Sequence, residues 1–154
     1  MSVNELTIRE AVIEDRGAIY GLLVELGYPG IDRGRFDKTF EQFLARDDLW
    51  LLVAERDHRV LGLASMSERP QLRLAGSLVT IDEMVIGEAA RGLGIGAMLL
   101  AEAKRRAKEL GARRLQLDTS RKRESYLRGF YAKNGLTEAD SAVMRLEFPK
   151  DDDR

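Results

Sequence analysis

Cysteine is absent from this chain of 154 residues, and histidine occurs once, as His58. Without cysteine there is no disulfide, no thiol nucleophile, no iron–sulfur cluster and no cysteine-ligated zinc. A single histidine leaves one imidazole as a candidate base and no histidine pair to bind a metal. Residues 56–59, Arg-Asp-His-Arg, have the polar character of a hairpin turn. We therefore predict a turn position for His58 and no metal site.

Long apolar runs are also lacking. The longest covers residues 49–54, whereas a membrane-spanning helix needs about 20 apolar residues. Residues 1–5 lack the basic stretch and the apolar core of a signal peptide. The formal net charge is −1, from 25 Lys+Arg against 26 Asp+Glu, so there is no general attraction to nucleic acid. We expect a cytoplasmic protein with no membrane partner and no nucleic-acid partner.

The chain does have the composition of an ordinary folded domain. Hydrophobic residues make up 44% of it and charged residues 33%, a balance typical of globular proteins. Its length suits one domain with one core. We predict a single domain over residues 1–149 and a disordered tail over residues 150–154.

Two hydrophobic periodicities divide the chain into strands and helices. Alternating or continuous apolar segments predict strands over 6–9, 49–55, 60–67, 74–86, 115–118 and 143–148. Apolar spacings of three and four residues predict helices over 15–26, 36–44, 94–110 and 126–134, the first capped by Asp15. The residues expected on the buried faces of the second and third helices are Phe36, Phe40, Phe43, Leu44, Met98, Leu99, Ala103, Ala107 and Leu110. Gly111 is expected to end the third helix.

The order of these segments predicts the fold class. The strands over 74–86 and 115–118 are joined by a long helix, and such a crossover makes two strands parallel. The earlier strands follow one another through shorter connections and should pair antiparallel. We therefore predict an α/β fold with a mixed sheet and helices on both faces.

The most informative segment leads from the strand over 74–86 into the helix over 94–110. Residues 84–97 read MVIGEAARGLGIGA, with three glycines at the helix entry. Glycine lets the backbone approach a ligand closely, and free N–H groups at a helix start bind anions. The segment is a candidate phosphate cradle, and a tight turn packed against the sheet is the alternative.

Two nucleotide-binding motifs can be compared with this spacing. A Walker loop is excluded, because no Gly-Lys-Ser/Thr is present. A dinucleotide fingerprint is closer, since Ala97 stands at the third glycine position and Asp118 ends the next strand, where a ribose-binding acid would lie. Too few residues follow Asp118 to complete a dinucleotide-binding sheet, so this reading stays a minor alternative.

Two motifs together resemble those of a known family. Residues 91–96, Arg-Gly-Leu-Gly-Ile-Gly, match the signature R/Q-x-x-G-x-G/A, and residues 129–136, Gly-Phe-Tyr-Ala-Lys-Asn-Gly-Leu, are similar to the segment F-Y-x-x-x-G-F/L. Both belong to the GNAT family of N-acetyltransferases, whose order of strands and helices agrees from residue 6 to 148. The resemblance implies a mostly antiparallel sheet with a splayed parallel pair. It also implies an N-acetyltransferase that moves an acetyl group from acetyl-CoA to a primary amine of a small molecule by direct transfer in a ternary complex.

The resemblance further implies which residues contact acetyl-CoA. Loop amides would bind its pyrophosphate, and the backbone of the strand end would pair with its pantetheine arm. The residues implied are Met84, Val85, Ile86, Arg91, Gly92, Leu93, Gly94, Ile95, Gly96 and Ala97. A basic cluster of Arg121, Lys122, Arg123 and Arg128 suits the 3′-phosphate of CoA, and a solvated helix face is the equal alternative.

Three residues are candidates for proton transfer. Tyr131 stands where the resembling enzymes have a tyrosine, which implies that a phenol with a pKa near 10 protonates the thiolate leaving group. Asp82 and Glu83 precede the cofactor-pairing residues on a strand, where successive side chains face opposite sides. We predict Asp82 as the base and Glu83 as a ligand of the substrate's cation. The alternatives are a core aromatic for Tyr131 and solvated carboxylates for the other two.

The chain departs from the family at position 124, where Glu124 replaces an asparagine that contacts pantetheine in many relatives. We expect Glu124 to cap the last helix or to meet the substrate. The family shapes its acceptor site with the first two helices and their connection, so Tyr28 and Glu25 are candidate substrate-binding residues, with helix packing as the alternative. A homodimer stays an open prediction, and a non-catalytic acyl-CoA sensor is the alternative to an enzyme.

Overall fold

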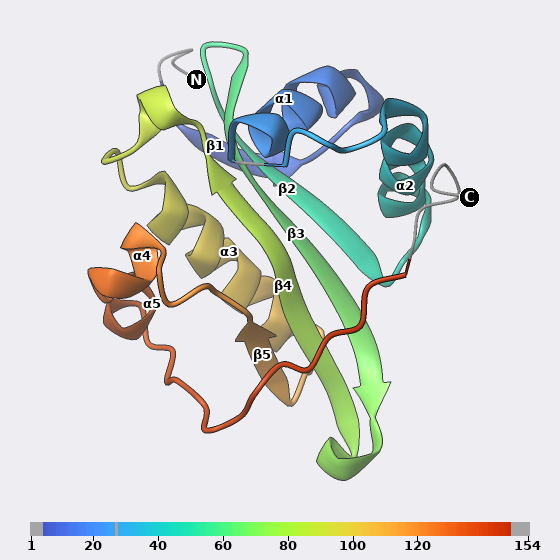
Figure 1. Cartoon of the computed structure of the whole chain (residues 1–154), viewed down its shortest axis with the longest axis vertical. Coiled ribbons are helices and arrows are strands. Elements are labelled where there is room, and N and C mark those ends of the chain that lie inside the picture. Colours follow the sequence, from blue (N-terminus) through green and yellow to red (C-terminus); the bar gives the residue numbers. More distant parts are fainter. Residues whose placement is uncertain (1–4, 27, 149–154) are drawn as a thin grey trace. The chain divides into compact units, whose positions relative to one another are not determined.

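The computed structural model describes residues 5–26 and 28–148 (Figure 1). The predicted tail over residues 150–154 and Gly27 of the first helix–helix connection lie outside the described residues. The chain divides into two compact units, Met1–Thr119 and Ser120–Arg154.

The first unit contains a five-stranded sheet in the order β1-β2-β3-β4-β5. Its strands are β1 (Thr7–Glu10), β2 (Leu49–Arg56), β3 (Arg59–Gln71), β4 (Gly76–Ile86) and β5 (Arg114–Leu117). Every neighbouring pair is antiparallel except β4 and β5, which are parallel. The predicted mixed sheet is thereby confirmed, and so is the parallel pair joined by the long helix (Figure 1).

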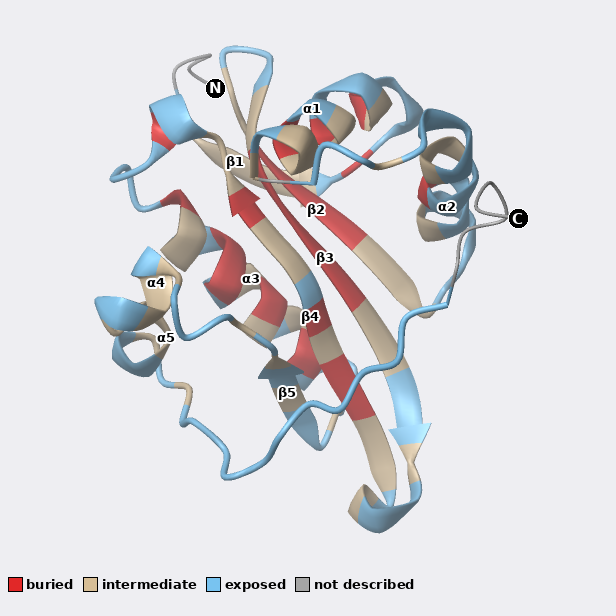
Figure 2. Cartoon of the chain, viewed as in Figure 1, coloured by how far each residue is buried: buried red, intermediate tan, exposed pale blue. Residues whose placement is uncertain are grey.

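Helices cover both faces of this sheet because alternate strand residues point to opposite sides. On one face α1 (Arg16–Leu26) and α2 (Arg33–Ala45) pack onto odd-numbered residues of β2 and β3. The shared core on this face consists of Ala11, Ile19, Leu22, Phe40, Leu51, Val53, Leu63 and Val85. On the other face α3 (Ile95–Glu109) packs against β3 and β4. Figure 2 shows that the buried residues concentrate in the central strands and on the sheet-facing side of α3.

The β2–β3 hairpin confirms the predicted turn over residues 56–59. Asp57 and His58 have φ angles of 53° and 60°, as the central residues of a type I′ turn require. The β3–β4 connection differs from the prediction. Residues 72–74 form the 3-10 helix η2, so β4 begins at Gly76 rather than at Leu74.

Asp15 does not cap α1, contrary to the prediction. It ends a 3-10 helix, η1 (Ile13–Asp15), and its side chain accepts hydrogen bonds from the backbone N–H of Val12 and from the guanidinium of Arg9. Asp15 is buried, and the hydrogen bond from Arg9 lowers the pKa of its carboxyl group. A buried carboxylate needs such a cation, and the side chain bonds to the backbone N–H at the start of η1 instead of one at the start of α1.

Three residues predicted to be buried are exposed. Met98 is 39% exposed because it lies at the edge of the stripe that α3 buries, which consists of Ile95, Leu99, Ala103 and Ala107. Leu110 keeps the phase of that stripe but follows the last helical residue, and it is 43% exposed. Leu44 lies in the last turn of α2 and is 39% exposed. Gly111 follows with a φ angle of 74°, which confirms it as the end of the helix.

The second unit contains two short helices where one was predicted. α4 (Glu124–Leu127) and α5 (Phe130–Lys133) are separated at Gly129, whose φ angle of 72° lies outside the helical region. The strand predicted over residues 143–148 is also wrong. Its apolar residues are exposed, up to 91% for Met144. Residues 120–148 contain no strand among those described, so within this unit the segment has no neighbour to pair with.

Candidate active site

A glycine loop links the end of β4 to α3, both of which are held by the core of the first unit. β4 ends at Ile86, and a 3-10 helix, η3 (Glu88–Ala90), precedes the loop. Gly92 and Gly94 have φ angles of 83° and 79°, a left-handed conformation that side-chain-bearing residues adopt at a cost. A Cβ atom at either position would meet nothing within 4 Å. Glycine is therefore required here for the backbone conformation, and the space beside the loop is open.

The loop ends in a set of free amide donors. The first N–H groups of an α-helix lack partners within the helix, and in α3 these belong to Ile95, Gly96 and Ala97. The first turn of α3 contains no acidic residue, and its N-cap Gly94 provides no side-chain oxygen. A helix of 15 residues adds the partial positive charge of its dipole at this end. The residues present thus fit an anionic group such as a pyrophosphate.

Beside the loop, the backbone of β4 has an open edge. The parallel ladder with β5 extends only to the pair Ile81 and Leu117. β4 continues to Ile86 while remaining paired with β3 on its other side. The backbone groups of residues 84–86 that point away from β3 therefore have no partner in β5, and of these the carbonyl oxygen of Ile86 accepts a hydrogen bond from Arg91 Nε. β4 thus extends beyond the end of β5, and the splay of the pair stays a prediction.

A β-bulge in β4 changes where the two candidate carboxylates point. Ser65 of β3 is paired with Glu83 and the next residue, Met66, is paired with Ile81, so Asp82 is the extra residue of the bulge. The hydroxyl group of Ser67 donates to Asp82 Oδ2 at 3.0 Å, and the hydroxyl group of Ser65 donates to the carboxylate of Glu83. Two serines two residues apart on a regular strand face the same side.

Both carboxylates therefore lie on one face of the sheet, and the prediction that only one of them does is wrong. The face is the one covered by α1 and α2, because Leu63, two residues before Ser65, belongs to the core beneath these helices. The bulge was missed because an extra residue in one strand is visible only in its pairing with the next. The alternating serines Ser65 and Ser67 on the neighbouring strand are the sequence signal that accompanies it, since each hydroxyl group donates to one of the two carboxylates.

The protein environment disfavours ionisation of these two carboxyl groups. Burial raises the pKa of Glu83, the hydrogen bond from Ser65 opposes that rise, and the charge of Asp82 adds to it. Burial likewise raises the pKa of Asp82, with a further rise from the charge of Asp118, and the hydrogen bond from Ser67 opposes it. The backbone N–H of Glu83 donates to Ser65 Oγ at 3.0 Å, so this hydroxyl group accepts one hydrogen bond and donates the other.

The remaining predicted residues have different surroundings. Glu25, in the last turn of α1, accepts a hydrogen bond from the backbone N–H of Glu88 at the start of η3. Tyr28 follows α1 and is exposed, with its backbone N–H bonded to the carbonyl group of Leu23. In the loop, Arg91 Nε donates to the carbonyl oxygen of Ile86 at 3.4 Å. Glu25 is thus attached to the predicted cofactor loop, a contact that sequence spacing did not indicate.

The second unit contains the predicted tyrosine. Tyr131 lies in α5, half-buried, with its ring edge-on to that of Phe130 at a centroid distance of 5.1 Å. Glu124 is the first residue of α4. Arg121 of the basic cluster is paired with Glu138 at 3.1 Å. The roles predicted for these residues stay predictions.

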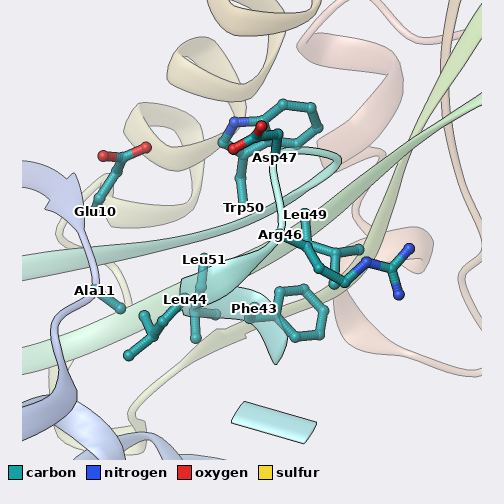
Figure 3. Close-up of a pocket in the computed structure, with 9 residues that line it drawn as sticks. All are labelled: Glu10, Ala11, Phe43, Leu44, Arg46, Asp47, Leu49, Trp50 and Leu51. Atoms are coloured by element: carbon teal, nitrogen blue, oxygen red, sulfur yellow. The ribbon is translucent and has the colours of Figure 1, made fainter. Parts of the chain in front are cut away.

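A separate hollow of about 250 Å³ lies where β2 begins and α2 ends (Figure 3). Its lining includes Phe43, Trp50 and the charged residues Glu10, Arg46 and Asp47. None of the predicted site residues lines this hollow. Over residues 5–26 and 28–148, no helix has the length and apolarity needed to cross a membrane.

Comparison with known proteins adds independent findings. The family model described as the acetyltransferase (GNAT) family matches residues 14–136. Aminoalkylphosphonate N-acetyltransferase of Salmonella typhimurium is 32% identical over 139 residues, which cover 90% of this chain and 88% of that protein. A rice protein (Oryza sativa subsp. japonica) named "Probable glucosamine 6-phosphate N-acetyltransferase 2" is 30% identical over 135 residues, covering 84% of this chain and 79% of the relative.

A solved structure agrees in fold over nearly the whole chain. A protein of Bacillus halodurans C-125 described as a transcriptional regulator superposes with a TM-score of 0.85 at 28% identity. The superposition covers 94% of this chain and 100% of that one.

Proposed function

The chain belongs to the GNAT family of acetyltransferases, and on that premise we propose that it transfers an acetyl group from acetyl-CoA directly to a primary amine of a small molecule. One observation carries the proposal. The bulge in β4 turns the side chains of Asp82 and Glu83 to one face of the sheet, on the strand that leads into the glycine loop. About 10 Å of strand separates Glu83 from Ile86, so the carboxylates and the phosphate cradle are within one cofactor length.

The cofactor would be held by backbone groups. When bound, acetyl-CoA supplies the activated acetyl thioester. The loop over residues 91–97 would hold its pyrophosphate, chiefly through the amides at the N-terminus of α3, and the edge of residues 84–86 that β5 does not pair would accommodate its pantetheine arm. The absence of acidic side chains in the first turn of α3 supports this assignment, since a carboxylate there would repel the phosphates.

The two carboxylates would have different roles toward the amine, one as its base and the other as its binding partner. A primary ammonium group must lose a proton before it can attack, and a carboxylate is a stronger base when its pKa is raised toward neutrality. Asp82 is partly shielded but still reaches solvent and can pass the proton on to it, which supports it as the base. Glu83 is more buried and is fixed through Ser65, which supports it as the residue that holds the ammonium group.

Tyr131 is proposed as the acid that protonates the departing thiolate. Its support is the motif over residues 129–136, which carries the tyrosine of the resembling enzymes. A phenol and a thiolate have comparable basicity, so the proton can be transferred without a large energetic cost.

The acceptor is proposed to be an amine that also carries an anionic group. The two curated relatives are named for an aminoalkylphosphonate and for glucosamine 6-phosphate, and both compounds combine an amine with a phosphorus oxyanion. Arg69 supports this choice, because it follows Ser67 by two residues on β3 and so shares its face. Arg69 is exposed, with its Cα about 7 Å further along the strand. A guanidinium group there can bind the oxyanion while Glu83 binds the ammonium group.

Thiol release from acetyl-CoA over a panel of amines tests this function. The panel contains 2-aminoethylphosphonate, glucosamine 6-phosphate and neutral primary amines of similar size. We expect turnover with at least one phosphorus-containing amine, and a higher melting temperature with CoA but not with NADH. CoA binding without turnover on the whole panel would favour an acyl-CoA sensor. Stabilisation by NADH alone would favour a dinucleotide-binding domain.

A further inference from the structure

The last turn of α1 is attached to the start of the glycine loop. The carboxylate of Glu25 accepts the backbone N–H of Glu88, which is 63 residues away in the sequence. One residue earlier, the N–H of Gly87 donates to the carbonyl oxygen of Leu61 at 2.8 Å. A Cβ atom at Gly87 would lie 3.2 Å from Leu22 Cδ2, so α1 packs closely against the backbone at this point.

These contacts determine which loop amides remain for a ligand. The amides of Ala90 and Arg91 bond within η3, to the carbonyl groups of Gly87 and Glu88. The amide of Glu88 is taken by Glu25. The first N–H groups of α3 have no partner within the helix and remain as donors for a ligand. Glu25 therefore removes an early amide from the anion site and holds the loop in the conformation that presents the later ones.

The connection that follows α1 is anchored on the same helix. Tyr20 donates its hydroxyl proton to the carbonyl oxygen of Ile31 at 3.0 Å, and Arg33 lies over the Tyr20 ring at 4.5 Å. The backbone N–H of Tyr28 bonds to the carbonyl group of Leu23 at 3.2 Å. Residues 28, 31 and 33 thus each contact α1, whose last turn contains Glu25.

We propose that Glu25 is a positioning residue that couples the connection between α1 and α2 to the cofactor loop. This inference rests on the proposed function and on the expectation from the family resemblance that this connection helps to shape the acceptor site. An acceptor that orders the connection stabilises α1 and, through Glu25, the loop that binds CoA. Such coupling is reciprocal, so the factor by which the acceptor tightens CoA is also the factor by which CoA tightens the acceptor.

The test measures the dissociation constant of CoA with and without saturating 2-aminoethylphosphonate. CoA carries no acetyl group, so both ligands are bound without turnover. In the unmodified protein we expect the amine to tighten CoA by about fivefold. Glu25→Ala should weaken CoA binding in the absence of the amine by about tenfold, because one charge-assisted hydrogen bond is lost. In this variant the amine should leave the dissociation constant of CoA nearly unchanged.

Two further variants separate positioning from other roles. Glu25→Gln keeps an oxygen that accepts the Glu88 N–H, so it should restore most of the CoA affinity. Glu41→Ala makes the same substitution at an exposed position of α2 and should leave both constants unchanged. Unaltered CoA affinity in Glu25→Ala, or no coupling in the unmodified protein, would overturn the inference.

Two remaining outcomes are also decisive. A higher KM for the amine in both Glu25→Ala and Glu25→Gln, with normal CoA binding, would make Glu25 an acceptor ligand and overturn the positioning role. Failure of the unmodified protein to bind CoA at all would instead refute the proposed function. The two failures are therefore distinguishable.

Discussion

Ser67 Oγ of β3 donates a hydrogen bond to Oδ2 of Asp82, the bulged residue of β4, over 3.0 Å. This bond favours the ionised form of Asp82, whereas burial and the charge of Asp118 favour the protonated form. The balance raises the pKa of Asp82. A base with a raised pKa is protonated over a wider acidic range, so the acidic limb of the pH–rate profile should report on this pair.

Ser67→Ala is expected to move that acidic limb to higher pH. Removing the hydroxyl group removes the one contact that lowers the pKa of Asp82, so the carboxyl group should hold its proton longer, by about half a pH unit to one. The measurement is kcat/KM as a function of pH. Asp82→Asn is the companion variant and should abolish the limb, because an amide takes no proton. If the acidic limb persists in Asp82→Asn, it reports the titration of another group.

Glu83→Gln is expected to stabilise the fold at neutral pH while it weakens substrate binding. Burial raises the pKa of Glu83 above its ordinary value of 4.5, so stability contributed by its protonated form is lost as pH rises through the folded-state pKa. Glutamine stays neutral at every pH and can still accept the proton of Ser65. We expect a melting temperature about 2–4 °C higher at pH 8 and no gain near pH 4.

Activity supplies the second half of this prediction. The KM for a cationic amine should rise in Glu83→Gln, because the ammonium group loses its counter-charge. An equal gain in melting temperature at pH 4 and pH 8 would show that the effect is packing rather than charge.

Arg69→Gln should discriminate between acceptors. Loss of a charge-assisted contact to an oxyanion is expected to raise the KM for 2-aminoethylphosphonate by about tenfold or more. The KM for a neutral amine of similar size should stay the same. Arg73→Gln is the matched control, since Arg73 lies in η2 beyond the strand face. Equal changes with both amines would remove Arg69 from acceptor recognition.

Gly94→Val tests the cradle. The φ angle of 79° at this N-cap costs a residue with a Cβ atom about 1–2 kcal/mol, so the loop should shift and CoA should bind at least about tenfold more weakly. Calorimetric titration with CoA measures this loss. Gly17→Ala is the control, because a Cβ atom there meets nothing within 4 Å and Gly17 lies inside α1. Normal CoA affinity in a folded Gly94→Val protein would place the phosphates elsewhere.

The sheet was predictable because its signals are local and consistent. Apolar residues over 49–54 and the polar turn at residues 56–59 specify a hairpin whatever surrounds them. Gly111 ends α3 by its own conformational freedom. The glycine loop was predictable for the same reason, since free amides at a helix start need no distant partner.

The differences arise where a distant partner decides the outcome. Aspartate is a residue type that often caps helices, but the carboxylate of Asp15 accepts a hydrogen bond from Arg9. Asp82 and Glu83 are successive residues and would face opposite sides of a regular strand. In the pairing with β3, however, Asp82 is the extra residue of a bulge, and both side chains face the same side. Residues 143–148 alternate like a strand and find no strand to pair with in their own unit. Hydrophobic periodicity indicates which secondary structure a segment prefers. Whether the segment adopts that structure depends on the chain segments that pack or pair with it.

Tyr131→Phe separates the acid from the base. Phenylalanine keeps the ring that meets Phe130 edge-on, so the packing of the second unit should be preserved. If Tyr131 protonates the thiolate, kcat should fall about 10²-fold and the basic limb of the pH–rate profile should disappear, while CoA affinity stays normal. Tyr126→Phe is the matched control: its hydroxyl group bonds to Glu138 in the same unit at 3.2 Å, and it should retain kcat within about twofold. A Tyr131→Phe enzyme with nearly normal kcat would mean that solvent protonates the thiolate, because a water molecule would then do what the phenol is proposed to do.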